Sequence, residues 1–390
     1  MKFKKICVVV YSRANYASIR SLLIEIKKTK FSELVLIIGS SAIVDKYGSI
    51  LDYIKKDGLQ PKYIMQNQIE GTSTKSMVKT TGLALFELPE ILDKEKPDLV
   101  FTVGDRHETI SSAIASSYMN IPVAHTMGGE ITGSIDEHIR HAITKLSHIH
   151  FVSNFDAYKR VIKLGESKKI TFNVGCPRID SINRILNEYN PLSVFKEISK
   201  HGSGDLKSIN YNDEFITLLF HPVTTEYQDI EKNFRNVLDA FIEAKVEKKI
   251  ILWPNADAGG DIISKTIRIE RELGKLKNVK MFKNLPLELY IPILDRTKCL
   301  IGNSSSALRD GAYIGVRAVN IGTRQSGRMK AANVKNCTYE KLQILKCISI
   351  QSKKDKAKKS FIYGRPGAAK KIIKILKKIK EIPIQKTLTF

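Results

Sequence analysis

Short apolar runs alternate along the chain with longer segments whose apolar residues recur every three or four positions. The run Lys5–Val10 predicts a strand, and the helix after it has one apolar face made of Ile19, Leu22, Leu23 and Ile26. The pattern also predicts helices over Ser76–Leu92 and Thr109–Tyr118, and strands over Leu34–Ile38, Asp98–Val103, Pro122–His125, His148–Val152 and Ile170–Val174.

The same alternation restarts after a polar connection at residues 180–212, which contains HGSGD. It predicts strands over Glu214–Phe220, Lys249–Trp253, Val279–Phe282, Cys299–Ile301 and Ala318–Ile321. Continuous apolar strands between amphipathic helices are typical of parallel sheets covered on both faces. We therefore expect an α/β fold with two Rossmann-like, doubly wound domains at residues 1–185 and 186–367. Ligands bind at the carboxyl ends of such strands, so we expect the active site in the cleft between the domains.

The chain length supports two domains, because 390 residues exceed the size at which one hydrophobic core usually stops growing. The apolar runs are too short to span a membrane, and no cleavage site of a signal peptide follows the basic N-terminus. The five cysteines are scattered without a CxxC pair, which suits a reduced compartment. We expect a cytoplasmic protein.

The net charge of +24 would suit nucleic acid, an acidic membrane surface or a phosphorylated substrate. Much of the lysine lies between Lys353 and Lys380, where residues 371–379 have the pattern of an amphipathic helix. A solvated lysine face over a packed apolar stripe explains this pattern best. The chain has no RNP motif, helix-turn-helix or basic-aromatic stripe, so we expect neither nucleic acid nor a membrane as a partner.

Several predicted strands end in polar clusters, where this architecture binds its ligands. The cluster GNSSS at residues 302–306 follows a strand, and its hydroxyl and N–H groups suit either an anion site or an ordinary N-cap. Arg324 and Arg328 follow the next strand and could contact the same phosphates. The chain has no GxxxxGK[ST] and no well-placed GxGxxG, which argues against an ATPase and an ordinary dinucleotide fold.

Four acids follow successive elements of the first half: Asp105, Glu130, Asp136 and Glu137. Converging carboxylates suit general acid–base chemistry, and Arg106, Arg140 and His221 could keep some of them ionised. The alternative for any one acid is a surface salt bridge. Several histidines of the first half are dense enough to suggest a metal, namely His107, His138, His141, His148 and His150. Their spacings fit no zinc pattern such as HExxH, so we expect no catalytic metal.

Longer motifs run in order over nearly the whole chain. In the first half they are SRANY from Ser12, GDR at 104–106, GGEITGSIDEHIRHAITKLSH at 128–148 and GCPRID at 175–180. In the second half they are HPVTTEY from His221, PNADAG from Pro254, IGNSSSALRDGAY from Ile301, NIGTRQSGR from Asn320 and IYGRPGA from Ile362. With these segments the chain resembles the hydrolysing UDP-N-acetylglucosamine 2-epimerases of sialic and legionaminic acid biosynthesis.

The resemblance implies a glycosyltransferase-B-like fold in which the C-terminal helix, within residues 368–390, packs back on the first domain. The implied reaction eliminates UDP across C1–C2 to give a glycal, and water then adds to release a free N-acetylmannosamine-type sugar. No metal, NAD or other cofactor is implied. The implied partners are the nucleotide-sugar substrate and further copies of the chain, in a dimer or a tetramer.

The resemblance also assigns roles to residues of this chain. Asp105, Glu130 and Asp136 match the catalytic carboxylates, and Glu137 is an adjacent candidate; one acid would take the C2 proton and another would assist hydration. His221 matches a histidine facing the diphosphate, where a protonated imidazole would offset the charge of the leaving group. Contacts to the substrate are implied for Arg13, Arg106, Arg140, Asn255, Ser304, Ser305, Asp310 and Arg324.

The chain departs from the family pattern mainly on the nucleotide side. Asp310 stands where the family has a ribose-binding glutamate, and Asn15 replaces the aspartate of the motif RADY. The segments GRExGxNV and YGDG read GRMKAANV from Gly327 and YGRP from Tyr363. Because the catalytic carboxylates are kept, the reaction type is better supported than the substrate. The alternative substrates are UDP-N,N'-diacetylbacillosamine and a GDP-sugar of legionaminic acid synthesis.

Four other functions compete with this interpretation. A glycosyltransferase of the same fold would need an acceptor site, and a non-hydrolysing epimerase would return UDP-N-acetylmannosamine, although GSIDEHIRH resembles the hydrolysing branch. A basic nucleic-acid-binding protein would bind arbitrary DNA with a steep salt dependence. A catalytically inactive member of the family is the fourth, because sites and not folds determine function.

Overall fold

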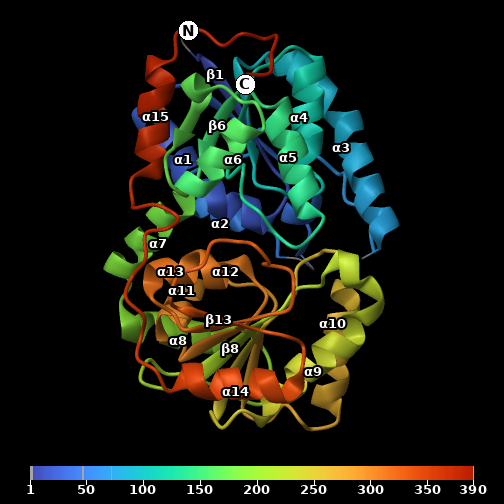
Figure 1. Cartoon of the computed structure of the whole chain (residues 1–390), viewed down its shortest axis with the longest axis vertical. Helices are drawn as coiled ribbons and strands as arrows, with labels where there is room; N and C mark the ends of the chain where they lie inside the picture. Colours follow the sequence, from blue (N-terminus) through green and yellow to red (C-terminus); the bar gives the residue numbers. More distant parts are fainter. Residues whose placement is uncertain (1–2, 46–47, 72, 390) are drawn as a thin grey trace. The chain divides into compact units, whose positions relative to one another are not determined.

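The computed structural model describes residues 3–45, 48–71 and 73–389, and the chain forms two compact units. Unit 1 comprises residues 1–131, 135–181 and 363–390, and unit 2 comprises residues 132–134 and 182–362. Each unit has a parallel sheet flanked by helices, which confirms the predicted fold class (Figure 1). The sequence analysis predicted one domain at residues 1–185, a second at residues 186–367 and a C-terminal helix within residues 368–390. Met1 and Phe390, at the outer ends of these ranges, lie outside the described residues.

Unit 1 contains a seven-stranded sheet in the order β3-β2-β1-β4-β5-β6-β7. Its strands are β1 (Lys5–Val10), β2 (Glu33–Ile38), β3 (Tyr63–Ile64), β4 (Leu99–Val103), β5 (Val123–Thr126), β6 (Ile149–Val152) and β7 (Thr171–Asn173). The order reverses at β1, where Val8 pairs in parallel with Leu36 on one side and Phe101 on the other. Such a reversal is the switch point of a doubly wound sheet.

Helices cover both faces of this sheet (Figure 1). Successive side chains of a strand point to opposite faces, so Val8 packs in one core with Ile19 and Val9 packs in the other with Leu88. The helices are α1 (Arg13–Thr29), α2 (Leu51–Lys56), α3 (Thr74–Glu95), α4 (Thr109–Tyr118), α5 (Asp136–Leu146), α6 (Phe155–Lys163), the start of α7 (Pro177–Glu188) and α15 (Ala368–Lys378).

The C-terminal helix α15 packs in the core of unit 1, where Ile372, Ile373 and Leu376 are buried. Its lysines are exposed, as the amphipathic pattern predicted. The carboxylate of Asp180 caps its first turn and accepts hydrogen bonds from the backbone N–H groups of residues 367, 368 and 369 at 2.6, 3.1 and 2.9 Å. The acid of the GCPRID motif therefore has a structural task at the start of α15.

Unit 2 contains a six-stranded sheet in the order β10-β9-β8-β11-β12-β13, which repeats the order of unit 1 with a switch point between β8 and β11. Its strands are β8 (Phe215–Leu219), β9 (Lys248–Leu252), β10 (Val279–Phe282), β11 (Cys299–Gly302), β12 (Ala318–Ile321) and β13 (Val334–Cys337). Its helices are the rest of α7 with α8 (Pro191–Lys200), α9 (Ile230–Glu243), α10 (Gly260–Glu272), α11 (Leu287–Arg296), α12 (Ser305–Leu308), α13 (Asp310–Ile314) and α14 (Lys341–Ser352).

The C-terminal tail after α15 contributes to a buried network of charges in unit 1. Glu166, which is nearly inaccessible, contacts Lys145 Nζ at 2.6 Å, Lys386 Nζ at 2.8 Å and His150 Nε2 at 3.0 Å. Burial opposes the ionisation of Glu166, but the hydrogen bonds from His150 and the two lysines outweigh it and lower its pKa to about 2. Lys386 also donates to the carbonyl oxygen of Lys145 at 2.7 Å and thereby fixes the tail.

Replacing Glu166 by glutamine is expected to lower the free energy of unfolding by about 2 kcal/mol at pH 7. The pKa of the folded state lies below the ordinary value of 4.5, so the stabilisation is complete above about pH 4.5 and is lost as the pH falls towards 2. Urea unfolding at pH 7, 4 and 3 should therefore show a difference between wild type and Glu166→Gln that shrinks with acidity. A difference independent of pH would contradict this account.

Two properties of the chain bear on the sequence predictions. Within the described residues, no helix is both long and apolar enough to cross a membrane. All five cysteines are free thiols, and four of them are buried. Burial raises the pKa of the Cys337 thiol, the partly exposed one, to about 12, which keeps it protonated and unreactive at neutral pH.

Candidate functional site

Each sheet reverses its strand order once, and predicted site residues follow the strands at both reversals. In unit 1, Arg13 lies after β1 and Asp105 after β4. In unit 2, His221 lies after β8 and Ser304 after β11. Loops on either side of a switch point separate and leave a place for ligands at the carboxyl ends of the strands. Each unit therefore has its own group of candidate site residues at the switch point of its sheet.

In unit 1, the ends of β1 and β4 are joined by the buried side chain of Asn15. Its Nδ2 donates to the carbonyl oxygen of Val103 at 2.9 Å, and its Oδ1 accepts from the backbone N–H of Tyr11 at 3.3 Å. An aspartate has no N–H group and could not satisfy Val103 in this way. The sequence analysis noted Asn15 only as a departure from the RADY motif. The structure explains the asparagine by its hydrogen bonds to the backbone of Val103 and Tyr11.

Arg140 is the centre of the predicted catalytic group. It lies on α5 with only 1% of its side chain exposed, and its guanidinium forms an ion pair with Asp105. Its Nη1 also donates to the carbonyl oxygen of Glu130 at 2.6 Å. Burial opposes its charge, but the carboxylates of Asp105, Glu130 and Asp136 raise the pKa of Arg140 above its ordinary value. Three of the predicted catalytic acids thus lie within the electrostatic field of one fixed cation.

The loop that carries Glu130 is held tightly against α6. Gly129 has a φ of 75°, and a Cβ there would lie 2.4 Å from the carbonyl oxygen of Ala157. Only glycine fits that position, so the backbone turns sharply and the side chain of Glu130 is directed into the protein, where it is 2% exposed. Arg160 supports the same loop by donating to the carbonyl oxygen of Gly129 at 2.9 Å.

Asp136 and Glu137 occupy the first turn of α5, where the helix dipole favours carboxylates. Asp136 is one turn before Arg140 and contributes to its raised pKa. Glu137 is instead partly exposed and pairs with His141 Nε2 at 3.4 Å, one turn later on the same helix. The structure therefore groups Asp136 with Asp105 and Glu130, and it gives Glu137 a different partner.

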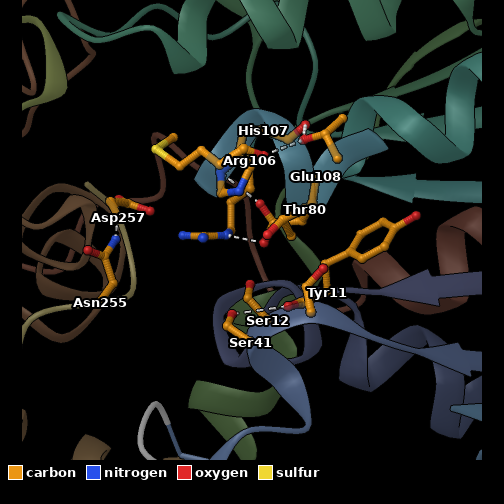
Figure 2. Close-up of polar contacts among 12 residues, drawn as sticks. Tyr11, Ser12, Ser41, Thr80, Arg106, His107, Glu108, Asn255 and Asp257 are labelled. Carbon is orange, nitrogen blue, oxygen red and sulfur yellow. Dashed lines mark hydrogen bonds and ion pairs between the residues drawn. The ribbon is translucent and has the colours of Figure 1, made fainter. Parts of the chain in front are cut away.

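Arg106 follows Asp105 in the chain but has its own acid, Glu108. Figure 2 shows Arg106 and His107 directed at the Glu108 carboxylate, with Arg106 Nε at 2.8 Å and His107 Nδ1 at 2.9 Å. Glu108 is 1% exposed; burial opposes its ionisation, but Arg106 and His107 hold its pKa well below the ordinary value. Sequence reasoning missed Glu108, because an acid after GDRH has the same appearance as any loop carboxylate.

A buried histidine fixes the turn immediately before Asp105. His125, at the end of β5, contacts the carbonyl oxygen of Gly104 through Nε2 at 2.8 Å. Burial lowers the pKa of His125 to about 3, so the ring is neutral at physiological pH and Nε2 carries the donating proton. The end of β5 is thereby tied to Gly104, the residue before the predicted catalytic carboxylate Asp105.

In unit 2, His221 and Asn303 join the ends of β8 and β11. Asn303 Oδ1 accepts from the backbone N–H of His221 at 2.8 Å, and its Nδ2 donates to the carbonyl oxygen of His221 at the same distance. Gly302 has a φ of 134°, and a Cβ there would lie 2.0 Å from the carbonyl oxygen of Leu219. An asparagine therefore bridges the switch point in both units. The sequence analysis missed Asn303 because it considered only the serines of the GNSSS cluster as candidate ligands.

The imidazole of His221 accepts a hydrogen bond from the backbone N–H of Asn255 through Nδ1 at 3.2 Å. A protonated ring would carry hydrogen on both nitrogens and would lose this contact. A neutral His221 with its proton on Nε2 would keep this contact, and the protonated imidazole implied by the resemblance stays a prediction. A neutral ring can still donate a hydrogen bond from Nε2 to a phosphate oxygen.

Asn255 and Arg324 share a carboxylate in unit 2. Figure 2 shows Asn255 beside Asp257, which accepts a hydrogen bond from its side-chain amide. Arg324 Nη2 lies 4.0 Å from Asp257 Oδ2, and its Nη1 donates to the carbonyl oxygen of Asn303 at 3.2 Å. Arg324 Nη1 is thus anchored at the end of β11, and a guanidinium held in this way suits an anionic group of a ligand.

Ser304, Ser305 and Asp310 lie at the short helices α12 and α13. Ser304 caps α12 by accepting from the backbone N–H of Ser306 at 3.3 Å. Asp310 is buried, and its carboxylate accepts from the Ser306 hydroxyl at 2.5 Å. The interpretation of this cluster as an N-cap is therefore correct at Ser304, and an additional role towards an anion stays a prediction.

Two other histidines of the first half serve the structure of unit 1. His150 pairs with Glu166, and His148 Nε2 contacts the carbonyl oxygen of Ile384 in the C-terminal tail at 3.0 Å. Over residues 3–45, 48–71 and 73–389, no group of three or more histidine, cysteine, aspartate or glutamate side chains is placed to hold a metal ion.

Comparison with known proteins gives matches along most of the chain. Residues 25–377 match the family model described as UDP-N-acetylglucosamine 2-epimerase. A UDP-N,N'-diacetylbacillosamine 2-epimerase (hydrolyzing) of Legionella pneumophila is 31% identical over 376 residues, covering 96% of each chain. A UDP-N-acetylglucosamine 2-epimerase of Neisseria meningitidis is 29% identical and covers 88% of this chain and 86% of its own.

Solved structures share the fold at low sequence identity. The Methanocaldococcus jannaschii UDP-GlcNAc 2-epimerase, in complex with UDP-GlcNAc and UDP, superposes with a TM-score of 0.80 at 18% identity. The superposition covers 96% of this chain and 99% of that one, which supports the glycosyltransferase-B-like fold expected from the resemblance. The family match spans well over half of the sequence, and a relative above 30% identity covers nearly all of it. This chain belongs to the UDP-N-acetylglucosamine 2-epimerase family.

Proposed function

We propose that this protein is a hydrolysing 2-epimerase that converts UDP-N-acetylglucosamine, or a related UDP-2-acetamido sugar, into UDP and a free N-acetylmannosamine-type sugar. The observation that carries the proposal is the buried Arg140, whose charge acts on Asp105, Glu130 and Asp136 together. The reaction needs one group to remove a proton and another to return one, and neighbouring carboxylates in different environments suit these two tasks.

The proposed chemistry has two steps. In the first, a carboxylate takes the proton from C2, the C1–O bond breaks, and its electron pair leaves with UDP while C1 and C2 form the double bond of a glycal. In the second, the oxygen of water bonds to C1 and a proton adds to C2 on the opposite face, which gives the 2-epimer. Asp105 and Glu130 are the two candidates for the C2 proton, and Asp136 would assist hydration. Only protons, water and UDP are exchanged, so the proposal includes no cofactor.

We assign the leaving diphosphate to side chains around the two switch points. A neutral His221 would donate from Nε2, because Nδ1 already accepts from Asn255. Arg13 and Arg324 would offset the charge that develops on UDP, since guanidinium groups bind phosphate oxygens in pairs. The hydroxyls of Ser304 and Ser305 would hold the diphosphate, Asp310 would approach the ribose, and Asn255 would contact the sugar nucleotide.

Incubation with UDP-N-acetylglucosamine in deuterated water, followed by proton NMR, tests the proposal. We expect free UDP and free N-acetylmannosamine with deuterium at C2, because the proton that returns comes from solvent. A nucleotide sugar returned intact with an inverted C2 would identify a non-hydrolysing epimerase instead. Transfer of the sugar to an added acceptor with retention of the C2 proton would identify a glycosyltransferase.

The second candidate substrate is UDP-N,N'-diacetylbacillosamine, on which the Legionella relative is named to act. The identity of 31% over 96% of the chain makes this sugar as well supported as UDP-N-acetylglucosamine. Parallel incubations with both sugars and a GDP-linked analogue should give one preferred kcat/KM. The absence of UDP or GDP release from all of them would refute the enzymatic proposal.

We place the enzyme in the cytoplasm, which its five free cysteines support.

A further inference from the structure

The tail that follows α15, residues 382–389, makes contacts that the proposed reaction does not use. In Figure 1 this tail, in red, crosses from α15 over the upper end of unit 1. Ile382 is buried in the same core as α15, and near the other end the backbone N–H of Thr389 donates to the carbonyl oxygen of Gly165 at 3.0 Å. Terminal residues are poorly ordered in most domains unless something ties them down, so a tail fixed at both ends calls for a reason.

Between these two ends, Lys386 reaches the C-terminal end of α5. Its ammonium group donates to the carbonyl oxygen of Lys145 at 2.7 Å and also to that of Ser147. Carbonyl groups at this end of a helix have no donor inside the helix and need one from elsewhere. A positive charge is also favoured there by the helix dipole. Lys386 therefore caps α5 from a segment far along the chain.

The contact is built into the protein. Glu166, with only 1% of its side chain exposed, accepts from Lys386 Nζ at 2.8 Å through Oε2 and from Lys145 Nζ at 2.6 Å through Oε1. One buried carboxylate thus holds the capping lysine and the side chain of a residue that the lysine caps. An ion pair in water contributes little to stability, whereas a pair with a buried carboxylate destabilises the fold when one partner is lost.

Helix α5 is linked to the catalytic group of unit 1 by two routes. The first is the ion pair of Arg140 with Asp105. The second begins at Thr144, whose Oγ1 donates to the carbonyl oxygen of Arg140 at 3.0 Å and lies 3.2 Å from His125 Nδ1. His125 in turn contacts the carbonyl oxygen of Gly104, the residue before Asp105, at 2.8 Å. The placement of α5 therefore affects the placement of this carboxylate twice.

The capped end of α5 is close enough to Arg140 to affect it. Lys145 follows Arg140 by about 8 Å along the helix axis, so a shift at the end of the helix is transmitted to the guanidinium through less than two turns. Misplacement of a reacting group by about 1 Å can cost about 100-fold in rate. Loss of the cap is thus expected to affect the chemical step and not only the stability of the fold.

We propose that the C-terminal tail positions α5 for catalysis and that Lys386 is the positioning residue through which it acts. This inference rests on the proposed function, because the residues that α5 orients are those assigned to the proton transfers. Lys386 itself is assigned no contact with the substrate. Its role is to hold the helix that places Arg140 beside Asp105.

Steady-state kinetics of Lys386→Met in the full chain tests the proposal. Methionine fills a similar volume but cannot donate to the carbonyl oxygens at the end of α5. We expect kcat for UDP release to fall about 10- to 100-fold, with KM little changed, because most of the groups assigned to the nucleotide lie in unit 2. Lys374→Met, which removes an exposed lysine of α15, is the matched control and should keep the wild-type kcat. A wild-type kcat in Lys386→Met would overturn the proposal.

Glu166→Gln distinguishes positioning from a general loss of stability. This variant also removes the ion pair with Lys386, but it leaves the lysine able to donate to the carbonyl oxygens of Lys145 and Ser147. We therefore expect Glu166→Gln to unfold at lower urea concentration than the wild type while keeping most of its kcat. Equal losses of kcat in Glu166→Gln and Lys386→Met would mean that the tail acts through stability alone, and the positioning role would be wrong.

Amide hydrogen exchange tests the placement of α5 independently of turnover. Residues 136–146 should exchange faster in Lys386→Met than in the wild type or Lys374→Met, while β1, in the centre of the sheet, should exchange at the same rate in all three. If the wild type turns over none of the sugars, the proposed function fails, and the exchange rates then decide the positioning role. Unchanged protection of residues 136–146 in Lys386→Met would refute it.

Discussion

Replacing Glu130 by glutamine, or Asp105 by asparagine, is expected to lower kcat for UDP release by about 10²–10⁴-fold. Both substitutions keep the size of the side chain and remove the ability to accept a proton. Asparagine at position 105 can still accept a hydrogen bond from Arg140, and the contact of Arg140 with residue 130 uses the backbone, so the local fold should survive. Release of UDP measured with a coupled assay, alongside thermal unfolding, tests the expectation.

Comparison of these two variants with Asp136→Asn, which removes the proposed hydration group, should also separate the two steps of the reaction. A variant that lacks the base for C2 should neither release UDP nor exchange the C2 proton in deuterated water. A variant that lacks only the group for hydration should release UDP and accumulate the glycal, which proton NMR detects. Asp52→Asn is the matched control, because Asp52 is an exposed acid of the same unit on α2. Undiminished turnover by Glu130→Gln would remove that carboxylate from the mechanism.

The alternation of apolar strands and amphipathic helices was sufficient to predict the parallel sheets. Strands buried on both faces read as short continuous apolar runs, and β1 begins and ends at the predicted residues Lys5 and Val10. The strands that were missed are β3, with two residues, and β13, which lies at the edge of its sheet with the mixed sequence VKNC. Edge strands bury little surface, so their apolar pattern is weak. Helix α8 lies within residues 180–212, which the sequence analysis treated as a polar connection. A polar segment can therefore still form a helix.

The candidate acids could be named from motifs, but their partners could not. Arg106 is adjacent to Asp105 in the sequence, whereas the structure pairs Asp105 with Arg140, which is far along the chain. Asn303 also acts through contacts that sequence order conceals, because it bridges to His221 at the end of another strand. Glu108 pairs instead with its sequence neighbours Arg106 and His107. Amino-acid spacing reports neighbours on one helix or strand, as with Asp136 and Arg140, and it carries no signal for pairs brought together by the sheet.

Replacing Arg140 by methionine is expected to lower the free energy of unfolding of unit 1 by about 3 kcal/mol, together with a loss of turnover. Methionine fills much of the same volume, but the Asp105 carboxylate then has no buried cation beside it and the carbonyl oxygen of Glu130 loses its donor. The free energy of unfolding of Arg140→Lys should lie between those of the wild type and Arg140→Met. One ammonium group cannot donate both to Asp105 and to the carbonyl oxygen of Glu130 with the geometry of a guanidinium.

A double-mutant cycle tests whether Arg140 acts through this charge pair. Asp105→Asn removes the carboxylate that needs a counter-charge, so adding it to Arg140→Met should cost much less stability than the sum of the two single changes. Urea unfolding of the four proteins at pH 7 measures this coupling. Strictly additive losses would mean that Arg140 stabilises unit 1 by packing alone. Recovery of stability in the double variant without recovery of UDP release would show that the buried arginine is needed because its charge holds the catalytic carboxylates in place.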